Sequence, residues 1–188
     1  MHSTNTQTNQ QFDTAISLCK GIFKRKTNDY GTAWRILRPS ALTDQLLIKA
    51  LRIRTIQEGK IQKVGDSVKD EFVGIVNYAA MALIQLSKGY ADYADINKEE
   101  AVALYNEQLQ TAKQLMLNKN HDYGEAWRQM RISSITDLII QKLMRIKSIE
   151  DNDGKTEISE GLEANYLDMV NYAIFVLIKM QEQENSNN

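Results

Sequence analysis

The chain of 188 residues is poor in several residue types, and each shortage excludes a class of protein. It has one proline and one cysteine, and aromatic residues make up 7% of it. A single cysteine, Cys19, excludes an internal disulfide and a four-cysteine zinc site, and it fits a small buried residue in a reducing compartment. No apolar run approaches the ~20 residues of a membrane-spanning helix. Residues 1–11 lack the apolar stretch of a secretory signal, so we expect a cytoplasmic protein without membrane contact.

Excess charge of one sign is also missing. The formal net charge is −1, which argues against a non-specific nucleic-acid binder, although it leaves room for a local basic groove. The sequence contains no glycine-rich phosphate loop, no His-Glu-x-x-His zinc motif and no nucleophile elbow. The familiar signatures of phosphate-loop enzymes, zinc proteases and serine hydrolases are therefore excluded.

What the chain does have is one heptapeptide twice. Residues 29–35 read Asp-Tyr-Gly-Thr-Ala-Trp-Arg, and residues 122–128 read Asp-Tyr-Gly-Glu-Ala-Trp-Arg. The offset of 93 residues continues for 28 positions, of which 14 are identical. After one inserted residue, the Val-Asn-Tyr-Ala of 76–79 matches that of 170–173. A period this long is not that of a solenoid array, so it indicates a duplicated domain.

Apolar residues recur at helical spacing along both copies, and they make up 43% of the chain. No window shows the alternation that is typical of a strand. The pattern predicts an all-α protein with six main helices, at residues 11–26, 41–57, 66–88, 98–118, 135–150 and 159–182.

The expected organisation consists of two repeats with polar segments around them. We expect a disordered lead-in over 1–9, a first repeat over 10–88, a linker and helix start over 89–102, a second repeat over 103–182 and a disordered tail over 183–188. A repeat of about 80 residues would be only marginally stable alone, because a small domain buries too little of its surface. The two three-helix repeats should therefore share one core, related by a pseudo-two-fold axis like that of a homodimer.

Two cations mark the fifth expected helix. Lys142 and Arg145 lie one turn apart beside apolar residues. A buried charge without a partner is costly, so these cations need anions. Structural ion pairs, for example with Asp168, are one explanation. The phosphate of a ligand is the other, because arginine binds phosphate with two hydrogen bonds and lysine with a point charge.

The sixth expected helix carries polar residues on the border of its apolar face. Asn165, Asp168, Asn171 and Tyr172 share this face. An aspartate one turn from an asparagine near a core can hold a divalent cation or a substrate hydroxyl. A hydrogen-bond network between helices, or a pair with Arg145, explains the same residues equally well. On the first explanation the cofactor is Mg²⁺, held by Asp168 together with Glu163.

Both tryptophans of the protein lie in the heptapeptides. Trp34 and Trp127 either fill the gap between helices or stack on a base, with Tyr123 and Arg128 lining the same pocket. Gly31 is expected at a turn with positive φ.

The first repeat keeps some of the candidate residues and replaces others. Gly74 stands where the second repeat has Asp168, and Glu71 stands where it has Asn165. Either one site survives in the second repeat, or the face has drifted without a function. The candidate counterparts in the first repeat are Lys49, Arg52, Glu71, Asn77, Tyr78 and Trp34.

At these motifs the chain resembles the nucleotide modification associated domain 1 family, long catalogued as a domain of unknown function. The resemblance rests on Asp-Tyr-Gly-x-x-Trp, on Lys-x-x-Arg-Ile at 142–146 and on Asp-x-x-Asn-Tyr at 168–172, and it covers nearly the whole chain as two copies. It implies a link to modified nucleotides. The helices are also similar to those of MazG-like and dimeric dUTPase pyrophosphohydrolases, which hold magnesium with paired carboxylates; here the first pair is replaced by Lys142 and Arg145.

Two functions follow as hypotheses. In the first, the chain binds a nucleotide, with a deoxynucleotide as the expected ligand. Lys142 and Arg145 face the phosphate, Asn171 and Tyr172 contact the sugar or base, and any reaction is magnesium-dependent phosphoanhydride hydrolysis, which needs only positioning, a metal and water. In the second, the chain is a non-catalytic binding or scaffold protein, and its motifs are structural.

Overall fold

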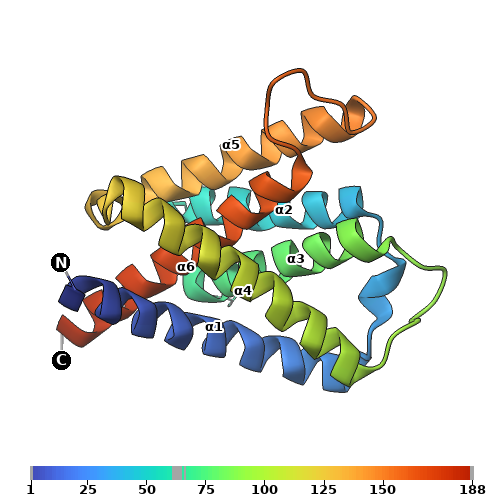
Figure 1. The fold of residues 1–188 in the computed structure, drawn as a ribbon, viewed down its shortest axis with the longest axis horizontal. Coiled ribbons are helices and arrows are strands. Elements are labelled where there is room, and N and C mark those ends of the chain that lie inside the picture. Colours follow the sequence, from blue (N-terminus) through green and yellow to red (C-terminus); the bar gives the residue numbers. More distant parts are fainter. Residues whose placement is uncertain (1, 61–64, 66, 187–188) are drawn as a thin grey trace.

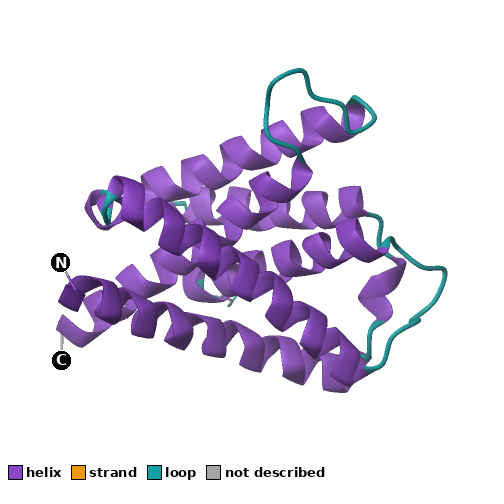
Figure 2. Cartoon of the chain, viewed as in Figure 1, coloured by secondary structure: helices purple, strands orange, loops and turns teal. Residues whose placement is uncertain are grey.

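The computed structural model describes residues 2–60, 65 and 67–186, with side chains from residue 7 onward (Figure 1). Over this part of the chain the fold is all-α, as predicted, and contains no strand (Figure 2). The elements are α1 (His2–Tyr30), η1 (Ala33–Ile36), α2 (Pro39–Gln57), α3 (Val68–Lys88), α4 (Lys98–Tyr123), η2 (Ala126–Gln129), α5 (Ile132–Asp151) and α6 (Leu162–Ser186), where η marks a short 3-10 helix.

The two halves have the same order of elements and equivalent boundaries. α1 and α4 end at Tyr30 and Tyr123, which are equivalent positions of the repeat, and α2 and α5 likewise begin at the equivalent Pro39 and Ile132. Each outer helix, α1 or α4, contacts both α3 and α6. α2 contacts α5, and α3 contacts α6. Exchanging the halves leaves this set of contacts unchanged, which is the pattern of a pseudo-two-fold axis.

α3 and α6 form the centre of the fold and make the most extensive contact between helices. Both are buried around most of their circumference, as expected for a helix with apolar residues on all sides. One continuous apolar cluster includes residues of all six α-helices. The halves therefore share a single core, and neither encloses one of its own.

The glycine of each heptapeptide ends the preceding helix. Gly31 and Gly124 both have φ of 64°, a left-handed conformation that glycine adopts without a steric penalty. Because α1 and α4 continue to this glycine, Asp29 and Tyr30 form the last helical turn rather than a loop. The tryptophan and arginine that follow lie in η1 and η2.

Helices extend into both terminal segments for which the sequence predicts disorder, 1–9 and 183–188, over their described residues. α1 begins at His2 and α6 continues to Ser186. The physical reason is an anchor that polar composition does not reveal: Gln11 Nε2 donates to Glu182 at 2.7 Å, and Thr8 Oγ1 contacts Glu125 of the second half. The two ends consequently lie side by side (Figure 1). Residues 1, 187 and 188 lie outside the described residues.

Two smaller expectations concern Cys19 and the membrane. Cys19 is fully buried, and burial raises the pKa of its thiol to about 12, so it is a packing residue.

Within the described ranges, every helix is too short or too polar to cross a membrane.

Candidate functional site

A cavity of about 170 Å³ opens in the second half between α4, η2 and α6. It gathers five of the residues predicted from the sequence, which are far apart along the chain before folding. They are Tyr123, Trp127, Asp168, Asn171 and Tyr172.

At this cavity, three helices contribute charged groups to one cluster. Asp168 of α6 accepts a hydrogen bond from Lys119 of α4 at 2.5 Å through Oδ1, and its Oδ2 lies 2.6 Å from Nζ of Lys142 of α5. The side chains of Lys142 and Asp168 are only 10% and 8% exposed, so the pair has little access to solvent. Burial alone would lower the pKa of Lys119, but the hydrogen bond to Asp168 and its negative charge outweigh burial and raise this pKa. Both lysines face one carboxylate as cations.

Lys119 was not among the residues predicted from the sequence. A single lysine on an amphipathic helix resembles any residue of a solvated face. The available signal was the repeat itself, because Lys26 occupies the equivalent position of the first half.

Asn171 and Tyr172 supply the uncharged polar groups of the cavity. Asn171 Nδ2 donates to the carbonyl of Ala112 at 3.0 Å, whereas its buried Oδ1 has no hydrogen-bond partner among the described residues. Burial, followed by the negative charge of Asp168, raises the pKa of Tyr172. Its hydroxyl therefore stays protonated at neutral pH and can donate or accept a hydrogen bond.

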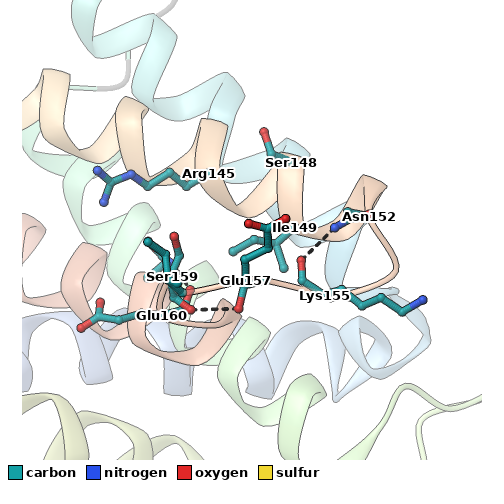
Figure 3. Close-up of a pocket in the computed structure, with 11 residues that line it drawn as sticks. Arg145, Ser148, Ile149, Asn152, Lys155, Glu157, Ser159 and Glu160 are labelled. Atoms are coloured by element: carbon teal, nitrogen blue, oxygen red, sulfur yellow. Dashed lines mark hydrogen bonds between the residues drawn. The ribbon is translucent and has the colours of Figure 1, made fainter.

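Arg145 lies apart from this cavity and lines a larger one of about 670 Å³, between α5 and the segment that leads into α6. Figure 3 shows Arg145 at one end of this space and Lys155 at the other. In the first half the equivalent Arg52 pairs with Glu71. Because Asn165 replaces that glutamate, Arg145 is exposed and forms no ion pair with any described residue.

Trp127 supports the cavity from inside the core. Its side chain is 5% exposed, Phe175 stacks on its ring at 4.3 Å with an angle of 5° between the planes, and the guanidinium of Arg128 lies 4.3 Å from the ring centroid. These contacts favour the packing explanation over base stacking. Trp34 likewise packs against Phe23, with 6.4 Å between centroids. The exposed ring at the cavity is Tyr123, at 76%.

Arg128, which the sequence predicts to line the ligand pocket, joins three parts of the chain: α1, α6 and the start of η2. It donates hydrogen bonds to Glu125, to Glu182 at 2.8 Å, and to Thr8 and Gln11 of α1 at 2.7 Å each. These bonds use donors on all three guanidinium nitrogens, so the arrangement supports a structural role for this residue.

The residues proposed for magnesium do not meet. Glu163 is exposed and does not line the cavity, while both oxygens of Asp168 contact lysines. Among the described residues there is no group of three acidic, histidine or cysteine side chains that could hold a metal. One carboxylate already paired with two cations does not fit a magnesium ion held by the protein alone.

The first half has an equivalent cavity of about 290 Å³ with a different distribution of charge. Glu71 pairs with both Lys49, at 3.1 Å, and Arg52. Lys49 lies directly over Gly74, where a Cβ would be 2.8 Å from its Cε. Nζ of Lys49 is also 5.6 Å from the centroid of the Tyr78 ring. The equivalent lysines, Lys49 and Lys142, thus contact carboxylates one helical turn apart.

Asn77 of the first half is fully satisfied. Its Nδ2 donates to the carbonyl of Cys19 at 3.2 Å, and its Oδ1 accepts from the hydroxyl of Tyr105 at 2.6 Å. This is a second polar difference between the two cavities, because the equivalent oxygen of Asn171 has no such partner among the described residues.

Fold and cavities together define an all-α protein made of two copies of one domain, each with a cavity where its first and third helices meet. The chain belongs to the Nucleotide modification associated domain 1 family, whose model matches residues 26–86 and again residues 119–180. The matched ranges include Lys26, Lys49 and Lys119, which line the two cavities, and Lys142, which pairs with Asp168. No curated protein and no solved structure matches the chain.

Proposed function

We propose that the chain binds a nucleotide, with a deoxynucleotide as the expected ligand, at the cavity of the second half. The observation that carries the proposal is that Lys119 and Lys142, from different helices, share the single carboxylate of Asp168. Two cations around one anion leave a local excess of positive charge that a phosphate can neutralise. The family description, with its link to nucleotide modification, supports the same class of ligand.

The other polar groups suit the uncharged parts of a nucleotide. Asn171 and Tyr172 offer hydrogen bonds to a sugar or base, and the exposed ring of Tyr123 offers a stacking surface. Arg145, which forms no ion pair with a described residue, extends the cationic surface along α5 by one turn from Lys142. In this arrangement Trp127 holds the cavity wall and makes no contact with the base.

Catalysis and location stay predictions. A nucleotide carries magnesium on its own phosphates, so a metal can enter with the ligand. Phosphoanhydride hydrolysis is the reaction expected from the sequence, and we assign no residue to a step of it. The cytoplasmic location belongs to the same set of predictions.

The direct test is thermal unfolding with common and modified nucleotides, each with and without magnesium. A ligand at 100 times its dissociation constant adds ~2.7 kcal/mol to the free energy of unfolding. For a chain of this length the melting temperature should then rise by roughly 5–11 °C. If no nucleotide shifts the transition, the scaffold hypothesis replaces this one. A shift that persists in Asp168→Asn would keep the binding and remove a metal role for that carboxylate.

The repeat provides a matched pair of double variants. Lys142→Met with Arg145→Met should abolish the nucleotide-induced shift but change the melting temperature of the free protein little, because Asp168 keeps Lys119. Lys49→Met with Arg52→Met leaves the buried Glu71 without two cations, so it should lower the melting temperature and keep the nucleotide-induced shift. The opposite assignment of the two effects would place the site in the first half.

A further inference from the structure

The two equivalent asparagines differ in one hydrogen bond. Asn77 and Asn171 each donate through Nδ2 to a backbone carbonyl of an outer helix, Cys19 of α1 and Ala112 of α4. Asn77 Oδ1 also accepts from Tyr105 of α4. Asn171 Oδ1 has no hydrogen-bond partner among the described residues. Because the whole residue is only 4% exposed, solvent does not replace that partner.

The missing partner follows from a single replacement across the halves. The repeat offset places Phe12 of α1 at the position equivalent to Tyr105 of α4. Both side chains are fully buried, and α1 contacts α6 as α4 contacts α3. Phe12 keeps the ring but lacks the hydroxyl that would reach the asparagine. The second half therefore supplies the hydroxyl that Asn77 of the first half accepts from, whereas no described residue of the first half supplies one to Asn171.

An acceptor left unsatisfied in a buried site costs free energy, and a partner from outside the chain recovers that cost on binding. Asn171 lines the cavity that also holds Asp168 and Tyr172. Trp127 Nε1 and Trp34 Nε1 both lack a hydrogen-bond partner within the described ranges, so the tryptophans do not distinguish the halves. The unsatisfied oxygen of Asn171 does.

We infer that Asn171 determines the specificity of the second-half cavity, because its Oδ1 accepts a hydrogen bond from an O–H or N–H donor on the sugar or base of the bound nucleotide. This rests on the proposed function and adds the chemistry of the recognised group. Ligands without a donor at this position leave the oxygen unsatisfied and bind more weakly. The phosphate is bound by different residues, so its contribution is independent of Asn171.

The test gives Asn171 the hydroxyl partner that Asn77 already has. Phe12→Tyr provides the hydroxyl within the chain, so the free protein should melt at a higher temperature and the gain from a ligand donor should disappear. We expect the affinity for a deoxynucleoside triphosphate to fall about tenfold, equivalent to 1.4 kcal/mol, and the affinity for inorganic triphosphate to stay unchanged. Tyr105→Phe is the matched control: it removes the same hydrogen bond in the first half and should lower the melting temperature with no effect on either ligand.

Ligand pairs identify the source of the donor. A dideoxynucleotide lacks the 3′-hydroxyl, and N3-methylthymidine triphosphate lacks a base N–H. The analogue without the recognised donor should bind the natural protein more weakly than the parent nucleotide does. In Phe12→Tyr, the analogue and its parent should bind with equal affinity. If Phe12→Tyr does not gain stability, Asn171→Leu provides the second measurement, because it removes the acceptor. It should weaken the binding of the nucleotide and leave the affinity for inorganic triphosphate unchanged.

The outcomes separate the two proposals. If neither nucleotide nor inorganic triphosphate binds the natural protein, the proposed function fails, and this inference fails with it. If both bind, but Phe12→Tyr and Asn171→Leu keep the natural affinities and rank all analogues as the natural protein does, only the inference is overturned.

Discussion

The two halves of the molecule share a backbone plan but differ in how their polar groups are paired. In the first half, Glu71 pairs with both Lys49 and Arg52, and Asn77 accepts a hydrogen bond from Tyr105 of α4. In the second half the carboxylate lies one turn further along the helix, as Asp168, and Arg145 forms no ion pair with a described residue.

The comparison shows that few replacements separate a cavity whose polar groups have partners within the chain from one with polar groups that have no partner among the described residues. Exchanging Glu71 and Gly74 for Asn165 and Asp168 moves the negative charge along one face of a helix. Exchanging Tyr105 for Phe12 removes one hydroxyl from the core. The apolar packing tolerates both changes, because the core cluster is continuous through the two halves.

The largest effect is expected from the heptapeptide arginines. Arg35 is 1% exposed and bonds to Asp95 at 2.8 and 3.1 Å and to Gln85, and its guanidinium lowers the pKa of Asp95 through these bonds. Arg35→Ala should lower the free energy of unfolding by about 3 kcal/mol, because it leaves a cavity and unpaired polar groups, and the melting temperature by roughly 6–12 °C. Calorimetry of the variant measures both.

Arg128→Ala is the control for that comparison. Arg128 makes more hydrogen bonds but is 26% exposed, so water can replace part of what is lost. We expect about half the loss of Arg35→Ala. Equal losses would contradict the view that burial, rather than the number of bonds, decides the cost.

A smaller effect is expected when the second-half carboxylate is introduced into the first half. In Gly74→Asp, the three atoms nearest to the new Cβ all belong to the flexible end of Lys49, which can pair with the new carboxylate as Lys142 pairs with Asp168. The free energy of unfolding should change by less than about 1 kcal/mol, because a flexible side chain relieves the contact. Chemical denaturation measures the change, with Gly74→Leu, which adds bulk without charge, as the control. A loss of several kcal/mol in Gly74→Asp would show that this backbone position, and not only its charge, differs between the halves.

The smallest effect concerns pH and Glu150, which lies where α2, α5 and α6 meet. Burial raises the pKa of Glu150 from its ordinary 4.5, against the hydrogen bond from Thr43. A carboxyl with a raised pKa in the folded state favours folding at acidic pH, and this contribution is lost as pH rises through the folded pKa. Glu150→Gln copies Gln57 of the first half, which donates to Thr136 at 3.0 Å.

We expect Glu150→Gln to remove this slope and to add about 0.5 kcal/mol at neutral pH, a small value because the group is half-exposed. Unfolding curves between pH 4 and 8 measure the slope of each protein. An unchanged slope in the variant would show that another group titrates here.

The fold was predictable because its evidence is local or repeated. Helical spacing of apolar residues predicts the helices, and the repeat predicts that the halves share one core. Both features follow from the chain without knowledge of distant contacts. The site was predictable as far as the two copies differ visibly, as at Gly74 and Asp168.

The remaining features depend on contacts between distant segments. Arg128 was expected to face a ligand, but its partners Thr8 and Gln11 lie in or beside a segment that its polar composition made look disordered. Asn171 looked identical to Asn77, and only the position of the outer helices shows that one has a hydroxyl partner and the other does not. Lys119 stands out as a site residue only through its ion pair with Asp168 on another helix.

The way each outer helix contacts both central helices has a consequence for how the molecule can be divided. A fragment with α1 to α3 would expose the faces of α1 and α3 that normally contact α4 and α6. Two fragments cut in the segment between α3 and α4 should therefore fold only on mixing, as complementing partners. A single repeat expressed alone should pair with a second copy of itself, which is the state from which a duplicated gene of this kind would arise.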